Sequence, residues 1–449
     1  MPELPVPELQ DLCAAAVDAA QGAEQVEAYA EERTSTEVEA HRGEVEGLSF
    51  SESRGVGVRV IVQGRLGFAY AADPSADEVR ATLARARENA SLATPDEHNV
   101  LPASEAIEPL EGLFFESLAG LSTADKVPVA LDLERTATSA DPRVTKTDAV
   151  RYGDGIGRVA IASSTGVSAE YRGTGCWAVV VTLAEAGDET QTGYSFKIAR
   201  RLEDLDTSSV ALEAVERAAR MLGATKPETA RLPVLLDPFA ASSFLGVLAG
   251  ALSAEAVQKG RSLFAGLVGE RVGSKGLTLV DDGRLLEGPG AEPFDGEGVP
   301  SGRTELLSAG VLNGFLHNTY TAHRGGTRST GNATRGYRST PGIGSTNLFV
   351  QPGERSFEEL LRQAEGGVLI QDVSGVHSGA SPISGEFSVG ATGLRISGGA
   401  LGEPVREMTI ASTVPDMLRA ISAVGSDLRW FSSIGVPSIL VGEMTIAGV

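Results

Sequence analysis

Cysteine and aromatic residues are scarce in this chain of 449 residues, and both shortages limit what it can be. The two cysteines, Cys13 and Cys176, lie far apart in the sequence and form no metal-ligand spacing. So few thiols in a large chain are typical of a reducing compartment rather than of a disulfide-stabilised secreted protein. Aromatic residues make up 5% of the chain, so we expect a core built mainly from Ala, Val, Leu and Ile.

Positive charge and long hydrophobic runs are also lacking. The formal net charge of −22 argues against nucleic acid or an anionic membrane as the main partner, because both repel an acidic protein. The longest uncharged apolar run, 239–254, is short for a bilayer span and contains Ser242, Ser243 and Ser253. No basic segment leads into an apolar stretch near the start, so we expect no signal peptide. These features predict a cytoplasmic globular protein.

Glycine is abundant, with 54 residues, and predicts many turns and β-rich architecture. The length of the chain suggests two domains. The segment 223–233 contains Gly223, Pro227 and Pro233 and is the best linker in the sequence. We therefore predict an N-terminal α+β domain over 1–224 and a C-terminal β-rich domain over 225–449.

Hydrophobic periodicity predicts the elements of both domains. Apolar residues that recur about every 3.6 residues, the period of an α-helix, predict helices at 5–20, 77–93, 126–138, 208–222, 239–259, 355–364 and 414–424. Alternating apolar and polar residues predict strands between the early helices, with a hairpin turn at Gln63-Gly64. The fold class that follows is α+β: strands with packed helices first, then a barrel-like or sandwich-like domain with a few helices.

The end of the 239–259 helix raises the question of metal chemistry. In zinc peptidases a glutamate on such a helix is the general base, and histidines beside it hold the metal. Here Glu255 lies between Ala254, which has no donor atom, and Lys259, which is normally charged. From the residues alone, a glutamate at the end of an apolar helix is most often a solvated side chain.

Several segments, in order, resemble the TldD/PmbA family, also called the modulator-of-DNA-gyrase family, over nearly the whole chain. They include RGVGVRVIVQGRLGFAYAA (54–72), PVLLDPFAASSFLGVLAGALSAEAVQKGRS (233–262), FDGEGVPSGRTELLSAGVLNGFLHNTYTA (294–322) and SGEFSVGATGLRISGGALGEPVREMTIA (384–411). In this family, TldD-type subunits carry His-Glu-x-x-x-His on the helix in question and a cysteine near the C-terminus. The positions matching the two histidines are Ala254 and Lys259, and Ser432 and Ser433 stand near that of the cysteine.

The resemblance is therefore to the PmbA/TldE type, the subunit without the metal motif. It implies no cofactor in this chain, zinc in a TldD-type partner, and no catalytic role for Glu255. Other metal sites receive little support, because the spacing of His317, His323 and His377 fits no recognised ligand pattern. No G-x-S-x-G elbow points to a serine nucleophile either.

A segment rich in arginine, HRGGTRSTGNATRGYRSTP at 323–341, has two interpretations. One is a solvated, flexible loop. The other is a substrate-binding loop whose cationic and amide groups hold a peptide. In the second interpretation the candidates are His323, Arg324, Arg335 and Arg338, with Arg328 in the same segment.

The resemblance implies a function as the non-metal subunit of a two-component cytoplasmic metallopeptidase that acts on unfolded or small peptides. The expected partners are a TldD-type subunit and a peptide substrate, with a homodimer when that subunit is absent. Two alternatives stay open at this point. One is a stand-alone homodimeric binding or scaffold protein, and the other is a subunit of a complex that cleaves a peptide-like intermediate in metabolite biosynthesis.

Overall fold

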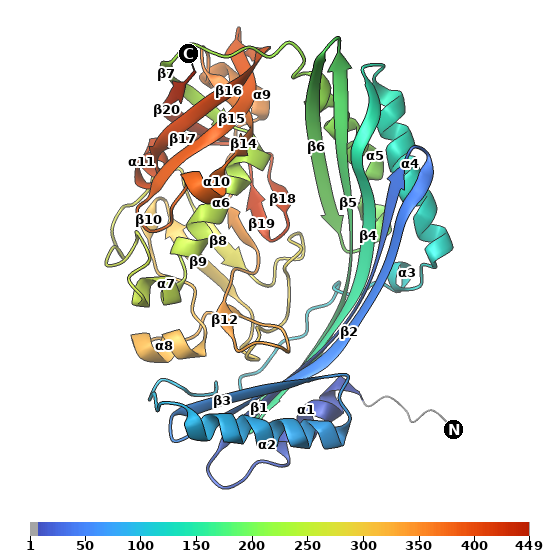
Figure 1. Ribbon diagram of the computed structural model, residues 1–449. Coiled ribbons are helices and arrows are strands. Elements are labelled where there is room, and N and C mark those ends of the chain that lie inside the picture. Colours follow the sequence, from blue (N-terminus) through green and yellow to red (C-terminus); the bar gives the residue numbers. More distant parts are fainter. Residues whose placement is uncertain (1–7, 449) are drawn as a thin grey trace.

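The computed structural model describes residues 8–448, so the first residues of the predicted 5–20 helix lie outside the described part. A long antiparallel sheet, in the order β3-β2-β1-β4-β5-β6, forms a curved ribbon along one side of the molecule (Figure 1). Its strands are β1 (Gln25–His41), β2 (Glu44–Val62), β3 (Arg65–Ala72), β4 (Val144–Ser163), β5 (Ser168–Ala186) and β6 (Glu189–Ala199). The turn between β2 and β3 is Gln63-Gly64, as predicted, and both residues have positive φ, 51° and 74°.

Helices cover one face of this sheet at its two ends and form two separate hydrophobic cores. They are α1 (Leu9–Val17) and α2 (Ala76–Leu92) at one end, and α4 (Thr123–Ala140) and α5 (Thr207–Ala219) at the other, with the short α3 (Glu116–Ala119) beside β4 and β5. Side chains alternate along β1, so Val26 and Ala28 face the helices. Glu27 and Tyr29 face the C-terminal region instead.

The C-terminal region contains a closed barrel of five strands. The order β16-β15-β14-β7-β20 closes because β16 also pairs with β20, and β17 extends the sheet beside β20. The strands are β7 (Ala230–Leu236), β14 (Val368–Ser374), β15 (Glu386–Ser397), β16 (Ala400–Thr413), β17 (Ile421–Val424) and β20 (Ile439–Ala447). The predicted α+β class with a barrel-like C-terminal region is confirmed. The division after residue 224 stays a prediction.

A second sheet, in the order β10-β9-β8-β13-β19-β18, packs with the barrel around a core that includes Phe244 and Leu248 of α6. Its strands are β8 (Leu279–Asp282), β9 (Arg303–Ser308), β10 (Val311–Leu312), β13 (Leu348–Val350), β18 (Arg429–Phe431) and β19 (Ile434–Val436). A two-stranded pair, β11 (Ala333–Thr334) and β12 (Gly342–Ile343), lies apart from both sheets.

Two of the predicted C-terminal helices differ in extent from those of the structure. The predicted 239–259 helix is two helices, α6 (Pro238–Ala251) and α7 (Ala254–Gln258), because the chain between them bonds to the backbone of Leu316. The predicted 414–424 helix ends at Ala420 as α11 (Val414–Ala420), because the next residues pair with β20 as β17. Helix α9 (Phe357–Gln363) was predicted, whereas α8 (Thr319–Gly325) and α10 (Val376–Gly379) were not. Over residues 8–448, every helix is too short or too polar to cross a membrane.

Candidate functional site

Glu255, the glutamate of the sequence motif, lies on the short helix α7 in an exposed ion pair. Its Oε1 atom is 2.6 Å from Nζ of Lys259, and both side chains are about half exposed, at 50% and 53%. This is the ordinary i,i+4 pair of a solvated helix surface. Helix α7 is held against α8, where Gln258 Nε2 donates to the backbone carbonyl of Thr321 at 2.8 Å. The geometry therefore gives Glu255 the surroundings of a surface residue.

The helix that packs against β18 and β19, the strands on either side of the C-terminal serine turn, is α6. Ser432 and Ser433 lie in the turn before β19, and β19 packs against α6. At Gly246 of α6, a Cβ atom would lie 3.7 Å from Cδ1 of Ile434. No histidine, cysteine, aspartate or glutamate occurs in α6. A metal site built from this helix and this turn therefore has no helix ligand, whichever register is chosen.

The three histidines considered as metal ligands have three different surroundings. His317 is partly buried, burial lowers the pKa of its imidazole, and its Nδ1 is buried without a hydrogen-bond partner in the described residues. His323 Nδ1 is 3.1 Å from Nδ1 of His98, which belongs to the loop after α2. His377 is exposed on α10. Among residues 8–448, no three His, Cys, Asp or Glu side chains form a group that could hold a metal ion.

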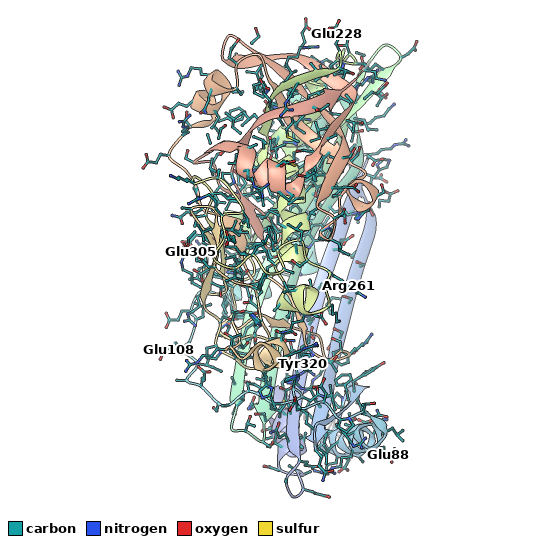
Figure 2. The ribbon with its side chains drawn as sticks, turned by 90° about the vertical axis from the view of Figure 1, so that its left-hand side faces the viewer. Glu88, Glu108, Glu228, Arg261, Glu305 and Tyr320 are labelled. Carbon is teal, nitrogen blue, oxygen red and sulfur yellow. The ribbon has the colours of Figure 1, made fainter. Side chains whose placement is uncertain are left out.

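Helix α8, whose last residues are the first residues of the arginine-rich segment, contacts the N-terminal region. Besides the pair of His323 with His98, Tyr320 Oη donates to Oδ2 of Asp96 at 2.8 Å. Figure 2 shows Tyr320 at the end of the C-terminal region that faces α2, the helix that carries Glu88. The sequence contained no signal for this contact, because Asp96 lies more than 200 residues from Tyr320.

Arg335, predicted to bind substrate, lies in a buried charge cluster that joins the two regions. Its guanidinium pairs with Glu27 of β1, and it lies over the ring of Tyr29 at 4.9 Å. Glu27 also pairs with Arg59 of β2 at 2.7 Å, and Arg59 reaches Glu297 of the C-terminal region at 2.9 Å. The side chains of the four charged residues are at most 7% exposed. We call Glu27, Arg59, Glu297 and Arg335 the inter-region cluster.

The other candidates of the arginine-rich segment are exposed. His323, Arg324 and Arg328 lie at or just after the end of α8, and Arg338 is exposed beside Tyr337, whose Oη accepts from Arg338 Nε at 2.8 Å. The segment is thus not a single solvated loop, since it contains a helix end, β11 and the buried Arg335 side chain. Substrate binding by His323, Arg324, Arg335 and Arg338 stays a prediction.

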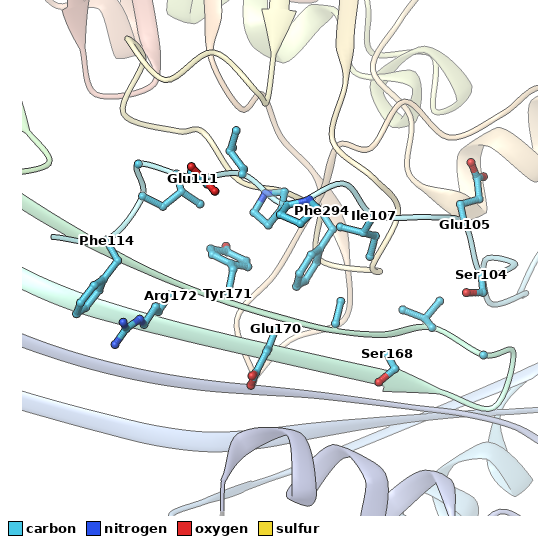
Figure 3. Close-up of a pocket in the computed structure, with 18 residues that line it drawn as sticks. Ser104, Glu105, Ile107, Glu111, Phe114, Ser168, Glu170, Tyr171, Arg172 and Phe294 are labelled. Atoms are coloured by element: carbon cyan, nitrogen blue, oxygen red, sulfur yellow. The ribbon is translucent and has the colours of Figure 1, made fainter. Parts of the chain in front are cut away.

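A pocket of about 640 Å³ opens where the exposed segment 103–112 passes the start of β5 (Figure 3). Phe114, Tyr171 and Phe294 supply aromatic surface, and the charged side chains that line it are those of Glu105, Glu111, Glu170 and Arg172. Tyr171 Oη donates to Glu292 at 3.1 Å, and burial raises the pKa of Glu292 to about 7. The sequence contained no signal for this pocket, because it forms where the segment meets a strand about 60 residues later.

Comparison with known proteins gives matches along most of the chain. Residues 229–448 match the PmbA/TldA metallopeptidase C-terminal domain, residues 26–90 match domain 1, and residues 116–222 match the central domain of the same metallopeptidases. Metalloprotease PmbA of Escherichia coli O157:H7 is 28% identical over 445 residues, which cover 98% of this chain and 96% of that protein.

Solved structures agree in fold over the same extent. A crystal structure from Thermotoga maritima, of a protein with a proposed role as a modulator of a DNA gyrase, has a TM-score of 0.88 at 28% identity and covers 94% of this chain and 96% of that one. TldE from Thermococcus kodakarensis has a TM-score of 0.89 at 24% identity and covers 98% and 99% of the two chains. The chain therefore belongs to the PmbA/TldD metallopeptidase family.

Proposed function

We propose that this chain is the non-metal, TldE-like subunit of a two-component metallopeptidase that acts on unfolded or small peptides. In this proposal a TldD-type partner contributes zinc and the general base, and this chain contributes the facing wall and part of the peptide-binding surface. The observation that carries the proposal is the composition of α6. This helix packs against β18 and β19, the strands joined by the turn of Ser432 and Ser433, yet it contains no His, Cys, Asp or Glu.

Two further observations support the proposal. Glu255 forms an exposed ion pair with Lys259, and it belongs to no group of His, Cys, Asp or Glu side chains in the described residues that could hold a metal ion. The fold similarity to TldE from Thermococcus kodakarensis extends over nearly the whole of both chains. Zinc-assisted hydrolysis needs an ion with an open coordination position, and in this proposal the partner provides it.

Reconstitution tests the proposal. The purified chain, a TldD-type subunit and their mixture are each incubated with an unstructured peptide, and hydrolysis is followed over a range of peptide concentrations. We expect turnover with the mixture, none with this chain alone, and complete inhibition by a chelator.

Two outcomes would overturn the assignment, and a third would change the role of the complex. Cleavage by this chain alone in the presence of chelator would exclude a metal-bearing partner as the source of activity. A mixture that neither associates in light scattering nor cleaves peptide would favour the stand-alone homodimeric binding protein. Cleavage confined to one peptide-like metabolite precursor would move the complex to a biosynthetic role.

A further inference from the structure

We propose that the open edge of β5 beside the pocket binds a peptide segment in extended conformation, through main-chain hydrogen bonds. This rests on the proposed function and deepens it, because it states where in this subunit a peptide lies and by which groups it is held. The site consists of the β5 edge from Ser168 to Arg172 and the segment 103–112 opposite, which we call the strap.

The first observation is that residues 168–175 of β5 have no neighbouring strand on one side. Along its whole length β5 pairs with β4, but β6 reaches only to the pair Cys176–Ala199. The N–H of Thr174 points outward and donates to the carbonyl of Leu113 at 2.9 Å. Alternate residues of an antiparallel strand point their N–H and C=O groups to the same side.

The outward groups of β5 before Thr174 therefore belong to Ser168, Glu170 and Arg172. Within residues 8–448, no backbone hydrogen bond connects these groups to another segment. An open edge of this kind is a template for pairing with another strand, and folded proteins usually cover it. Here about five residues of edge, roughly 14–17 Å, remain available to an added strand.

The second observation is that the strap holds the space beside this edge open. It is pinned before and after the open edge, by Thr165 Oγ1 donating to the carbonyl of Pro102 at 2.6 Å and by the Thr174–Leu113 bond at 2.9 Å. Its middle is held away from β5 by Arg284, which donates to the carbonyls of Glu108 and Pro109 at 3.1 and 3.0 Å. The resulting pocket of about 640 Å³ is within the usual range for ligand sites, roughly 300–1,000 Å³.

The side chains around the edge indicate which peptides fit. In Figure 3, Tyr171 and Phe294 lie on the strap side of β5, whereas Ser168 and Glu170 point to the opposite side. The side chains of an added strand would alternate between these two sides. Apolar side chains would fit beside Tyr171 and Phe294, and polar side chains would fit beside Ser168 and Glu170. Three carboxylates, those of Glu105, Glu111 and Glu170, line the pocket against one guanidinium, so basic peptides are favoured.

Another open edge provides a control. Residues 44–53 of β2 pair with β1 but lie beyond the end of β3, and Leu48 and Phe50 are exposed there, at 54% and 66%. Residues 44–53 do not line the pocket beside β5. A proline in place of Phe50 therefore tests the general effect of proline on an open edge.

The experiment measures binding of a fluorescent peptide to the purified chain by anisotropy. The probe is an unstructured peptide of about eight residues with alternating leucine and lysine, a length matched to the open edge with short overhangs. Glu170→Pro removes one outward N–H, whereas Glu170→Ala removes only the side chain. We expect Glu170→Ala to weaken binding modestly, about twofold to threefold, because one of the three carboxylates is lost. Glu170→Pro should weaken it about tenfold beyond Glu170→Ala, because it also removes the outward N–H. Phe50→Pro should leave binding within about twofold of that of the unmodified chain.

Two peptides methylated on alternate backbone nitrogens test the same bonds from the ligand side. In a peptide paired with β5, alternate backbone N–H groups point toward β5 and the others point away. Methylation of the nitrogens that point toward β5 should abolish binding, whereas methylation of the others should not. This pair carries the test even if Glu170→Pro fails to fold, which circular dichroism reveals. Equal binding of both methylated peptides, or unchanged binding to a folded Glu170→Pro chain, would overturn the proposal.

Failure of this inference is distinguishable from failure of the proposed function. Peptide binding is measured on this chain alone, without a TldD-type subunit, whereas the function is measured as hydrolysis by the mixture. A chain that binds peptide at β5 but adds nothing to hydrolysis refutes the function only. A mixture that cleaves peptide at rates unaffected by Glu170→Pro, with no binding to this chain alone, refutes the β5 site only.

Discussion

Replacing Arg335 by methionine should destabilise the protein strongly, because it leaves an unpaired charge in the inter-region cluster. The cluster has two carboxylates, Glu27 and Glu297, and two guanidiniums, Arg59 and Arg335, all at most 7% exposed. With Arg335 removed, Arg59 alone has to serve both carboxylates. Breaking a buried pair from one side costs about 3–5 kcal/mol, and loss of the cation–π contact with Tyr29 adds about 1 kcal/mol.

Chemical unfolding followed by circular dichroism and fluorescence measures this cost, with Arg338→Met as the matched control. Arg338 lies in the same segment but is exposed, so its replacement should change the unfolding free energy by no more than about 0.5 kcal/mol. The double variant Arg335→Met/Glu27→Gln restores neutrality and should cost less than the sum of its two single variants. If Arg335→Met shifts the transition no further than Arg338→Met, the cluster does not stabilise the fold.

Three other predictions concern catalysis, metal and pH. Glu255→Gln should leave hydrolysis by the reconstituted mixture unchanged, since Glu255 lies in an exposed pair with Lys259, and a tenfold fall in kcat would contradict this. The chain purified without a metal-affinity tag should hold less than one zinc or iron ion after dialysis; elemental analysis that finds a full equivalent would redirect attention to His317, His323 and His377. Burial raises the pKa of Glu292 from 4.5 to about 7, so its contribution to stability is present below pH 4.5 and is lost as the pH rises through 7. Glu292→Gln should make the unfolding free energy less dependent on pH between pH 5 and 8. An unchanged dependence on pH would show that Glu292 is not its source.

Sequence periodicity was sufficient to predict those helices whose beginning and end are determined by nearby residues. Helix α2 has apolar residues on one face and a capping box formed by Ser75 and Glu78, so a short window predicts it almost to its ends. Helix α6 is apolar on most sides and has no periodic face that marks its end. It ends where Leu252 and Ala254 bond to Leu316, and that partner is more than 60 residues away. Likewise, β17 is a strand because β20 pairs with it.

The residues at the motif positions could be read from the sequence, but the side chains that the fold brings together could not. Ala254 and Lys259 are visible in the sequence, whereas the packing of α6 against β18 and β19 is known only from the structure. Burial of Arg335 was not visible, because its partner Glu27 is 308 positions away and the surrounding residues are glycine-rich and polar. The pocket beside β5 depends in the same way on contacts of the strap with residues 165–174, about 60 positions later.

Closure of the barrel by β20 has a consequence for the order in which the protein forms during synthesis. Strand β20 lies between β7 and β17 and also pairs with β16, yet it is the last strand, Ile439–Ala447, of the described chain. A nascent chain that has not yet extended past Ile439 leaves β7 with one empty side, some 200 residues after β7 was made. The barrel therefore completes only after most of the polypeptide has left the ribosome. Until then, the backbone groups at the open edge of β7 are unpaired, and this edge can pair with another chain or bind a chaperone.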